Sequence, residues 1–151
     1  MITIEEFKKK QTSKTRLIGL DLGSKRIGIS ICDEKQSIAT PFKTINRINT
    51  SELVNELKEI IRENNIKGIV IGNPINMDGT SGSSAQSVKD ISTNISQFID
   101  LPVFLWDERL STVGAFNLSS QLDVNISKKI KKIDENAAAF ILQGAIDYLN
   151  N

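Results

Sequence analysis

The order in which strand-like and helix-like segments follow one another constrains the fold of this chain more than any other feature. Residues 17–20 form a short apolar run, and isoleucines then alternate with small residues over 27–32, which predicts two strands joined by a tight turn. A third strand is expected over residues 37–45, where Pro41 favours an edge position or a bulge. The fold should therefore open with a hairpin and one further strand.

The next part of the chain alternates helices with buried strands. Residues 50–65 carry apolar side chains at the helical repeat, and the apolar runs 66–71 and 101–106 are typical of buried parallel strands. Between these two strands we expect a helix whose apolar face is made by Val88, Ile91, Ile95 and Phe98. The pattern predicts an α/β fold, with a mixed five-stranded sheet and helices on both of its faces.

The C-terminal part is predicted to be mostly helical. One helix is expected over residues 112–121 and a last helix from about Ile133. The polar and basic residues 121–132 between them are expected to form a loop.

The length and composition of the chain fit a single domain. With 151 residues, of which 39% are hydrophobic, it can bury one sizeable core. We assign residues 16–151 to that domain. Residues 1–15, in which Phe7 is nearly the only bulky anchor, are interpreted as a polar N-terminal extension.

Cysteine content and apolar runs indicate a cytoplasmic protein. Cys32 is the only cysteine, so it cannot form an internal disulfide, and we expect a buried or half-buried thiol in a reducing compartment. No run approaches the roughly 18 apolar residues of a membrane span. We therefore expect no membrane association.

The charge balance limits how the chain could bind nucleic acid or catalyse a reaction. The formal net charge is +1, so binding to nucleic acid would depend on local basic clusters. The chain has no histidine, the commonest general base and zinc ligand. Catalysis would therefore use carboxylates, lysine or a metal-bound hydroxide.

Three carboxylates mark the ends of predicted buried elements. Asp21 follows the first apolar run, Glu108 follows the run 101–106, and Asp134 precedes the apolar part of the last helix. An acid at the mouth of an apolar core needs a cation, a partner or water, and three that converge could hold Mg²⁺ or Mn²⁺ against a phosphate. Phosphodiester hydrolysis is therefore our leading hypothesis.

Each acid taken alone also has a simpler interpretation. Asp21 suits an ordinary hairpin turn, and Asp134 would complement a helix dipole. Asp107 and Glu108 suit a solvated turn, and if the strand persists they point to opposite faces, so that only one easily joins Asp21. The residues alone leave these alternatives open.

Basic residues flank all three acids. Lys25 and Arg26 follow Asp21, and Arg109 follows Glu108. A basic run precedes Asp134 and consists of Lys128, Lys129, Lys131 and Lys132. These side chains could bind phosphates, although such a run is more often a solvated loop than a nucleic-acid clamp.

Four motifs together resemble the bacterial YqgF/RuvX family, which has an RNase H-like fold. They are DLGSKRIG at residues 21–28, IGNPINMDGT at 71–80, WDERLST at 106–112 and KIDENAA at 132–138. The resemblance extends from about Arg16 to the C-terminus, in the family's order and spacing. Asn73 stands where the family more often has leucine, and residues 1–15 lie outside the family pattern.

The resemblance implies a metal-dependent nuclease. Asp21, Glu108 and Asp134 match the family's catalytic acids and would bind Mg²⁺ or Mn²⁺, while the flanking basic residues would position the substrate strand. Family members are described as nucleases for the 5′ end of precursor 16S rRNA or as Holliday junction resolvases. The expected partner is therefore structured RNA, with branched DNA as the alternative, bound by a monomer or weak homodimer.

Two other functional classes share features with this sequence. Actin-like and sugar-kinase ATPases share the Asp-x-Gly turn, but they enclose ATP between two lobes and this chain supplies one. A non-catalytic nucleic-acid-binding module would be expected to lack the acids, and all three are present. Metal-dependent cleavage of structured RNA would distinguish an enzyme from such a module.

Overall fold

A computed structural model describes residues 1–74, 79, 82–107 and 126–151, with side chains for all of these except 126–135. At its centre is a five-stranded sheet in the order β3-β2-β1-β4-β5. The strands are β1 (Arg16–Leu22), β2 (Arg26–Cys32), β3 (Ala39–Asn46), β4 (Ile66–Asn73) and β5 (Val103–Asp107). β2 pairs antiparallel with β1 and β3, whereas β4 runs parallel to β1 and β5. This confirms the predicted mixed sheet.

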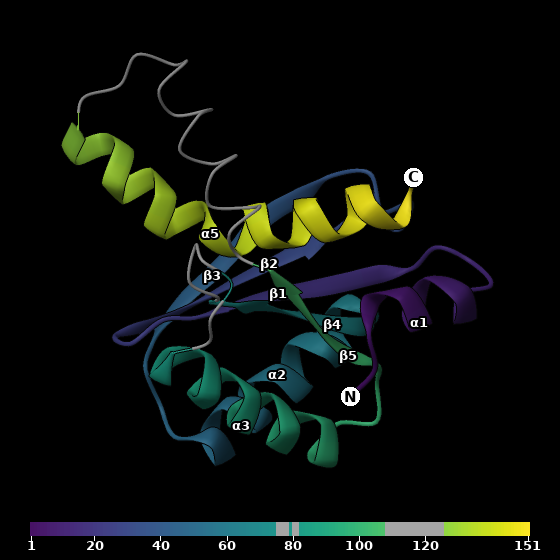
Figure 1. Cartoon of the computed structure of the whole chain (residues 1–151), viewed down its shortest axis with the longest axis horizontal. Helices are drawn as coiled ribbons and strands as arrows, with labels where there is room; N and C mark the ends of the chain where they lie inside the picture. The colour runs from purple at the N-terminus through teal and green to yellow at the C-terminus, as the bar shows by residue number, and fades with distance from the viewer. Residues whose placement is uncertain (75–78, 80–81, 108–125) are drawn as a thin grey trace.

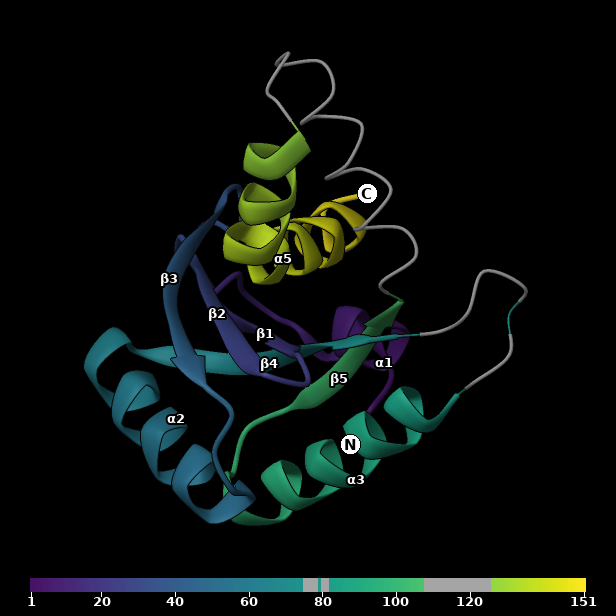
Figure 2. The ribbon, with the colours of Figure 1, turned by 90° about the vertical axis from the view of Figure 1, so that its left-hand side faces the viewer.

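Helices cover both faces of the sheet, also as predicted (Figures 1 and 2). α2 (Thr50–Asn64) and α3 (Ser83–Phe98) lie on one face. The other, which we call the α5 face, is covered by α5 (Ile126–Leu149), and the short α1 (Ile4–Lys10) packs into the same core. None of the described helices is long and apolar enough to cross a membrane.

Side-chain alternation along the strands separates two apolar cores. In β1, Ile18 and Leu20 belong to the core beneath α2 and α3, whereas Leu17 packs on the α5 face. In α3, Val88 and Ile95 are buried as predicted. Phe98 was wrongly assigned to that face: it is 61% exposed, because the helix ends there and Ile99 takes the buried position.

β3 lies at the edge of the sheet and contains a bulge, as Pro41 led us to expect. Ile29 pairs with Lys43 and Ser30 with Pro41, so Phe42 is the additional residue. Proline has no N–H to donate, and an edge strand with a bulge accommodates it without breaking the ladder.

The N-terminal segment does not project from the domain. Ile4 and Phe7 of α1 are buried, and the Phe7 ring packs on Phe104 at a centroid distance of 4.9 Å. The Ile2 N–H donates to the Val103 carbonyl at 3.0 Å. Residues expected to form a polar extension thus share the core of the α5 face.

The last helix begins earlier than the sequence led us to expect. α5 starts at Ile126, so the basic run lies in a helix and the prediction of a loop up to Lys132 was wrong. The apolar repeat of Ile126, Ile130 and Ile133 was the signal that we missed. The helix predicted over residues 112–121 lies outside the described residues.

Candidate active site

Asp21 lies near the carboxyl end of β1, at the edge of the sheet where the parallel strands β1, β4 and β5 end. Its backbone pairs with Gly28 of β2, and its side chain is half-buried. By strand alternation Asp21 lies on the same face as Leu17 and Gly19, which is the face covered by α5. The carboxyl edges of parallel strands are a frequent location of active sites in α/β proteins.

The turn after Asp21 is held by contacts that its sequence does not reveal. A Cβ atom at Gly23 would lie 2.6 Å from the Arg26 carbonyl oxygen, so only glycine fits there without movement. The Arg47 guanidinium donates to the Gly23 carbonyl at 2.7 Å, and the Arg47 backbone N–H donates to the Lys25 carbonyl at 2.9 Å. Arg47 therefore holds the turn that follows Asp21.

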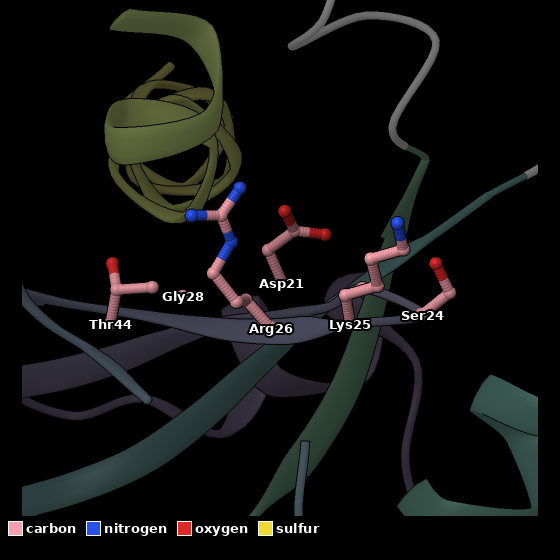
Figure 3. Close-up of a pocket in the computed structure, with 7 residues that line it drawn as sticks. Asp21, Ser24, Lys25, Arg26, Gly28 and Thr44 are labelled. Carbon is pink, nitrogen blue, oxygen red and sulfur yellow. The ribbon is translucent and has the colours of Figure 1, made fainter. Parts of the chain in front are cut away.

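This turn forms part of the wall of a cavity of about 490 Å³ (Figure 3). In Figure 3 the side chains of Asp21, Lys25 and Arg26 rise together from the sheet on the side of α5. The cavity is lined by Asp21, Gly23, Ser24, Lys25, Arg26, Gly28 and Thr44. An acid flanked by two cations in a concave surface can bind a phosphate group together with a metal ion.

α5 crosses the sheet very close to Asp21. A Cβ atom at Gly28 would lie 3.4 Å from the Ala138 Cβ and 3.7 Å from the Asp21 Cβ. The Ser30 hydroxyl donates to the Ala138 carbonyl at 2.7 Å, which fixes the helix on β2. Small residues alternating with isoleucine in β2 thus mark the helix crossing, a signal that we had interpreted only as a strand.

For the remaining predicted site residues the structure describes either the backbone alone or nothing. Glu108 and Arg109 lie outside the described residues. Asp134 belongs to α5, one turn before Ala138, and the basic run of Lys128, Lys129, Lys131 and Lys132 precedes it in the same helix, with no side chain described. The described side chains include no group of three or more potential metal ligands, and of the three predicted acids they include Asp21 alone.

Comparison with known proteins adds evidence from relatives. A family model described as "RuvX: Holliday junction resolvase" matches residues 15–148. A protein of Pelagibacter ubique named "Putative pre-16S rRNA nuclease" is 76% identical over 151 residues, covering 100% of both chains. A protein of Cereibacter sphaeroides with the same name is 43% identical, over 98% of this chain and 92% of the relative.

A solved structure with a similar fold is "T. thermophilus RuvC in complex with Holliday junction substrate". It aligns with a TM-score of 0.54 and 9% sequence identity, covering 89% of this chain and 94% of that one. At this identity the similarity concerns the fold, which is RNase H-like as predicted.

Proposed function

The chain belongs to the RuvX family, and from this membership we propose that it is a metal-dependent nuclease that processes the 5′ end of precursor 16S rRNA. The names of relatives 76% and 43% identical support this substrate. Such an enzyme would work in the cytoplasm, where precursor rRNA is found in bacteria. The proposed catalytic acids are Asp21, Glu108 and Asp134.

The observation that carries the proposal is the close packing of Ala138 on Gly28, the backbone partner of Asp21. Asp134 precedes Ala138 by four residues in α5, and residues at that spacing share a helix face. The arrangement therefore supports a site in which Asp134 approaches Asp21 from the helix above it.

Strand alternation argues against Asp107 as the second acid of the site. Phe104 and Trp106 pack in the core of the α5 face, whereas Val103 and Leu105 pack in the opposite core. Asp107, the last residue of β5, follows Trp106 and by the same alternation points to the face opposite Asp21. This argument is independent of the family resemblance.

The donor chemistry of the proposed site suits a hard divalent cation. Three carboxylates offer only oxygen ligands, as Mg²⁺ and Mn²⁺ prefer, and the chain has no histidine for softer metals. When bound, such an ion would lower the pKa of a water molecule and stabilise charge on the phosphate.

The residues of the chain itself would bind and orient the substrate strand. Lys25 and Arg26 lie on either side of Asp21 in Figure 3 and can donate to phosphate oxygens. The Gly23 turn, held by Arg47, keeps these side chains beside the acid. Asp21 would supply a fixed negative charge to the metal from a half-buried position.

The test is a side-by-side cleavage assay with the 5′ leader of precursor 16S rRNA and a four-way DNA junction. At matched Mg²⁺ and salt we expect RNA to be cut faster, and a chelator to stop the reaction. A resolvase makes two symmetric incisions and usually works as a dimer with a broad basic face, which fits poorly with a net charge of +1.

Holliday junction resolution is the second candidate, because it is the description of the matching family model. Paired, symmetric junction nicks made by a stable dimer would favour that activity over rRNA processing. Binding of either nucleic acid without metal-dependent cleavage would contradict both.

A further inference from the structure

We propose that a second cavity, next to the candidate active site, binds one nucleobase of the substrate strand. This cavity, which we call the Trp106 pocket, has a volume of about 510 Å³. It lies between the start of the chain, the end of β5 and the last turn of α5, and is lined by residues 1–5 and 105–107, Asn73 and Tyr148. The inference rests on the proposed function and names a contact that selects bases.

The position of the pocket in the sheet relates it to Asp21. Leu20 pairs with Ile71, and Ile71 pairs with Leu105, so Asp21 and Trp106 each lie one residue further on, with Gly72 of β4 between them. Neighbouring strands are about 4.8 Å apart, which puts the two Cα atoms about 10 Å apart. A short stretch of single strand can span that distance.

Aromatic rings make up one side of the pocket. The rings of Trp106 and Tyr148 have centroids 6.1 Å apart and planes tilted by 56°. The Lys8 ammonium lies 5.0 Å from the Tyr148 ring centroid and also donates to the Tyr148 carbonyl, which holds this residue in place. Trp106 is only half-buried, so its ring offers a stacking surface for a base.

Hydrogen-bond acceptors make up the other side. The side-chain oxygen of Asn73 is buried and has no hydrogen-bond partner, which is costly unless a ligand supplies a donor. The acidic residues Glu5 and Asp107 also line the pocket. The unpartnered Asn73 oxygen favours a planar ligand that carries an amino group, and acidic residues around the pocket make it a poor site for phosphate.

An adenine, cytosine or guanine base has these properties. Each combines an aromatic face for Trp106 with an exocyclic amine that can donate to Asn73. Uracil has no exocyclic amine, and its one free donor, the ring N3–H, lies between two carbonyl oxygens that the acidic residues would repel. We therefore infer that the Trp106 pocket prefers an amino-bearing base over uracil.

Intrinsic fluorescence provides a direct test, because Trp106 is the only tryptophan in the chain. The full-length protein would be titrated, in the presence of a chelator, with a short adenylate RNA, a uridylate RNA and an abasic strand of equal length. We expect adenylate to quench Trp106 at saturation and the abasic strand to bind without quenching. Uridylate should bind about three- to tenfold more weakly than adenylate, the factor expected when one hydrogen bond is weakened or lost.

Variants separate stacking from hydrogen bonding. Trp106→Leu should weaken adenylate binding about tenfold, measured by the anisotropy of a labelled strand. Asn73→Leu, which preserves approximate size, should reduce adenylate affinity to the level of uridylate. Phe98→Leu is the matched control, because Phe98 is an exposed aromatic residue of α3 on the other face of the sheet. Thermal unfolding would verify that each variant is folded.

Several outcomes would contradict the proposal that the Trp106 pocket binds a base. These are an adenylate strand that leaves Trp106 fluorescence unchanged, equal quenching by the abasic strand, or equal affinity for adenylate and uridylate. Burial of Trp106 by self-association in the absence of RNA would instead identify a second copy of the chain as the occupant.

The cleavage assay separates this inference from the proposed function. If the leader RNA is cleaved in a metal-dependent way but RNA binding leaves Trp106 fluorescence unchanged, base binding in the Trp106 pocket is contradicted and the nuclease function is not. Base-dependent quenching without any cleavage would support the pocket and contradict the nuclease.

Discussion

At the scale of single residues, Asp21 is the side chain on which the proposed chemistry depends most directly. Asp21→Asn removes its charge at nearly constant volume from a half-buried position at the edge of the sheet. We expect Mg²⁺- or Mn²⁺-dependent hydrolysis to fall by more than about 100-fold, since even residues that only support a metal ligand contribute about 10- to 100-fold. Rates of RNA cleavage and the thermal midpoint would be measured together.

Asp90→Asn is the matched control for this substitution, because Asp90 is an exposed acid of α3, where it bonds only to Gln86 among the described contacts. It should leave cleavage unchanged. An Asp21→Asn protein that is unfolded, or that is fully active, would contradict the proposed role of Asp21.

Cys32 gives a prediction about reactivity and pH. Its side chain is buried, as the sequence led us to expect, and burial raises the pKa of the thiol above its ordinary value. The raised pKa favours the neutral thiol in the folded protein, so the Cys32 contribution to stability is lost as pH rises above the pKa of the unfolded thiol. We expect a thiol reagent at pH 8 to react at least about tenfold more slowly with folded than with unfolded protein. Equal rates would show that Cys32 is accessible.

The sequence groups candidate site residues that share one motif, but it does not reveal contacts that form only in the folded chain. Asp21, Lys25 and Arg26 are adjacent in the sequence, and the cavity brings all three together. Arg47 was missed because its partner is a backbone carbonyl 24 residues away, and no local pattern encodes such a contact. The catalytic and binding roles of all these residues, and those of Glu108 and Asp134, stay predictions.

At the scale of elements, the crossing of α5 over β1 and β2 decides the geometry of the site. A Cβ atom at Gly19 would lie 2.5 Å from the Ser30 hydroxyl oxygen and 2.7 Å from the Leu142 Cβ. Gly19→Ala should therefore force α5 away from the sheet and lower the free energy of unfolding by about 1–3 kcal/mol.

Gly28→Ala is the matched comparison, because the added Cβ would meet its nearest neighbour, the Ala138 Cβ, at 3.4 Å. We expect its effect on stability to be clearly smaller than that of Gly19→Ala, as measured by urea denaturation of both variants. Equal stability of the two would show that α5 is not packed at Gly19 as described.

The elements also show what sequence patterns can reveal. Pro41 predicted the edge position and bulge of β3 because proline lacks a backbone donor, a property that acts locally. The start of α5 was misjudged because the charges of the basic run obscured the isoleucine repeat that continues through it. Phe98 was misassigned because periodicity alone does not show where a helix ends.

At the scale of the whole molecule, the net charge of +1 means that binding to nucleic acid must depend on local clusters. Replacing Lys128, Lys129, Lys131 and Lys132 with glutamine should weaken RNA binding and flatten its dependence on salt. Each lost phosphate contact reduces the slope of log K against log salt by about 0.7 for single strands. Affinities measured over a salt series test this, and an unchanged slope would show that the basic run makes no phosphate contact.

The overall topology could be predicted from the sequence, because strand-like and helix-like segments follow one another in a clear order and four motifs keep the spacing of one family. The packing of the N-terminal segment could not be predicted from the sequence. Two of its few apolar residues, Ile4 and Phe7, are buried because they pack against the core of the α5 face, a contact that no local pattern encodes.

The most direct test of the central claim is the position of Mn²⁺ in crystals of the protein, located by anomalous scattering. We predict a Mn²⁺ peak at the carboxyl edge of the sheet, with oxygen atoms of Asp21, Glu108 and Asp134 each about 2 Å from a bound ion. A structure that places Asp134 on the far side of the molecule from Asp21, or that binds Mn²⁺ without Asp21, would contradict the account.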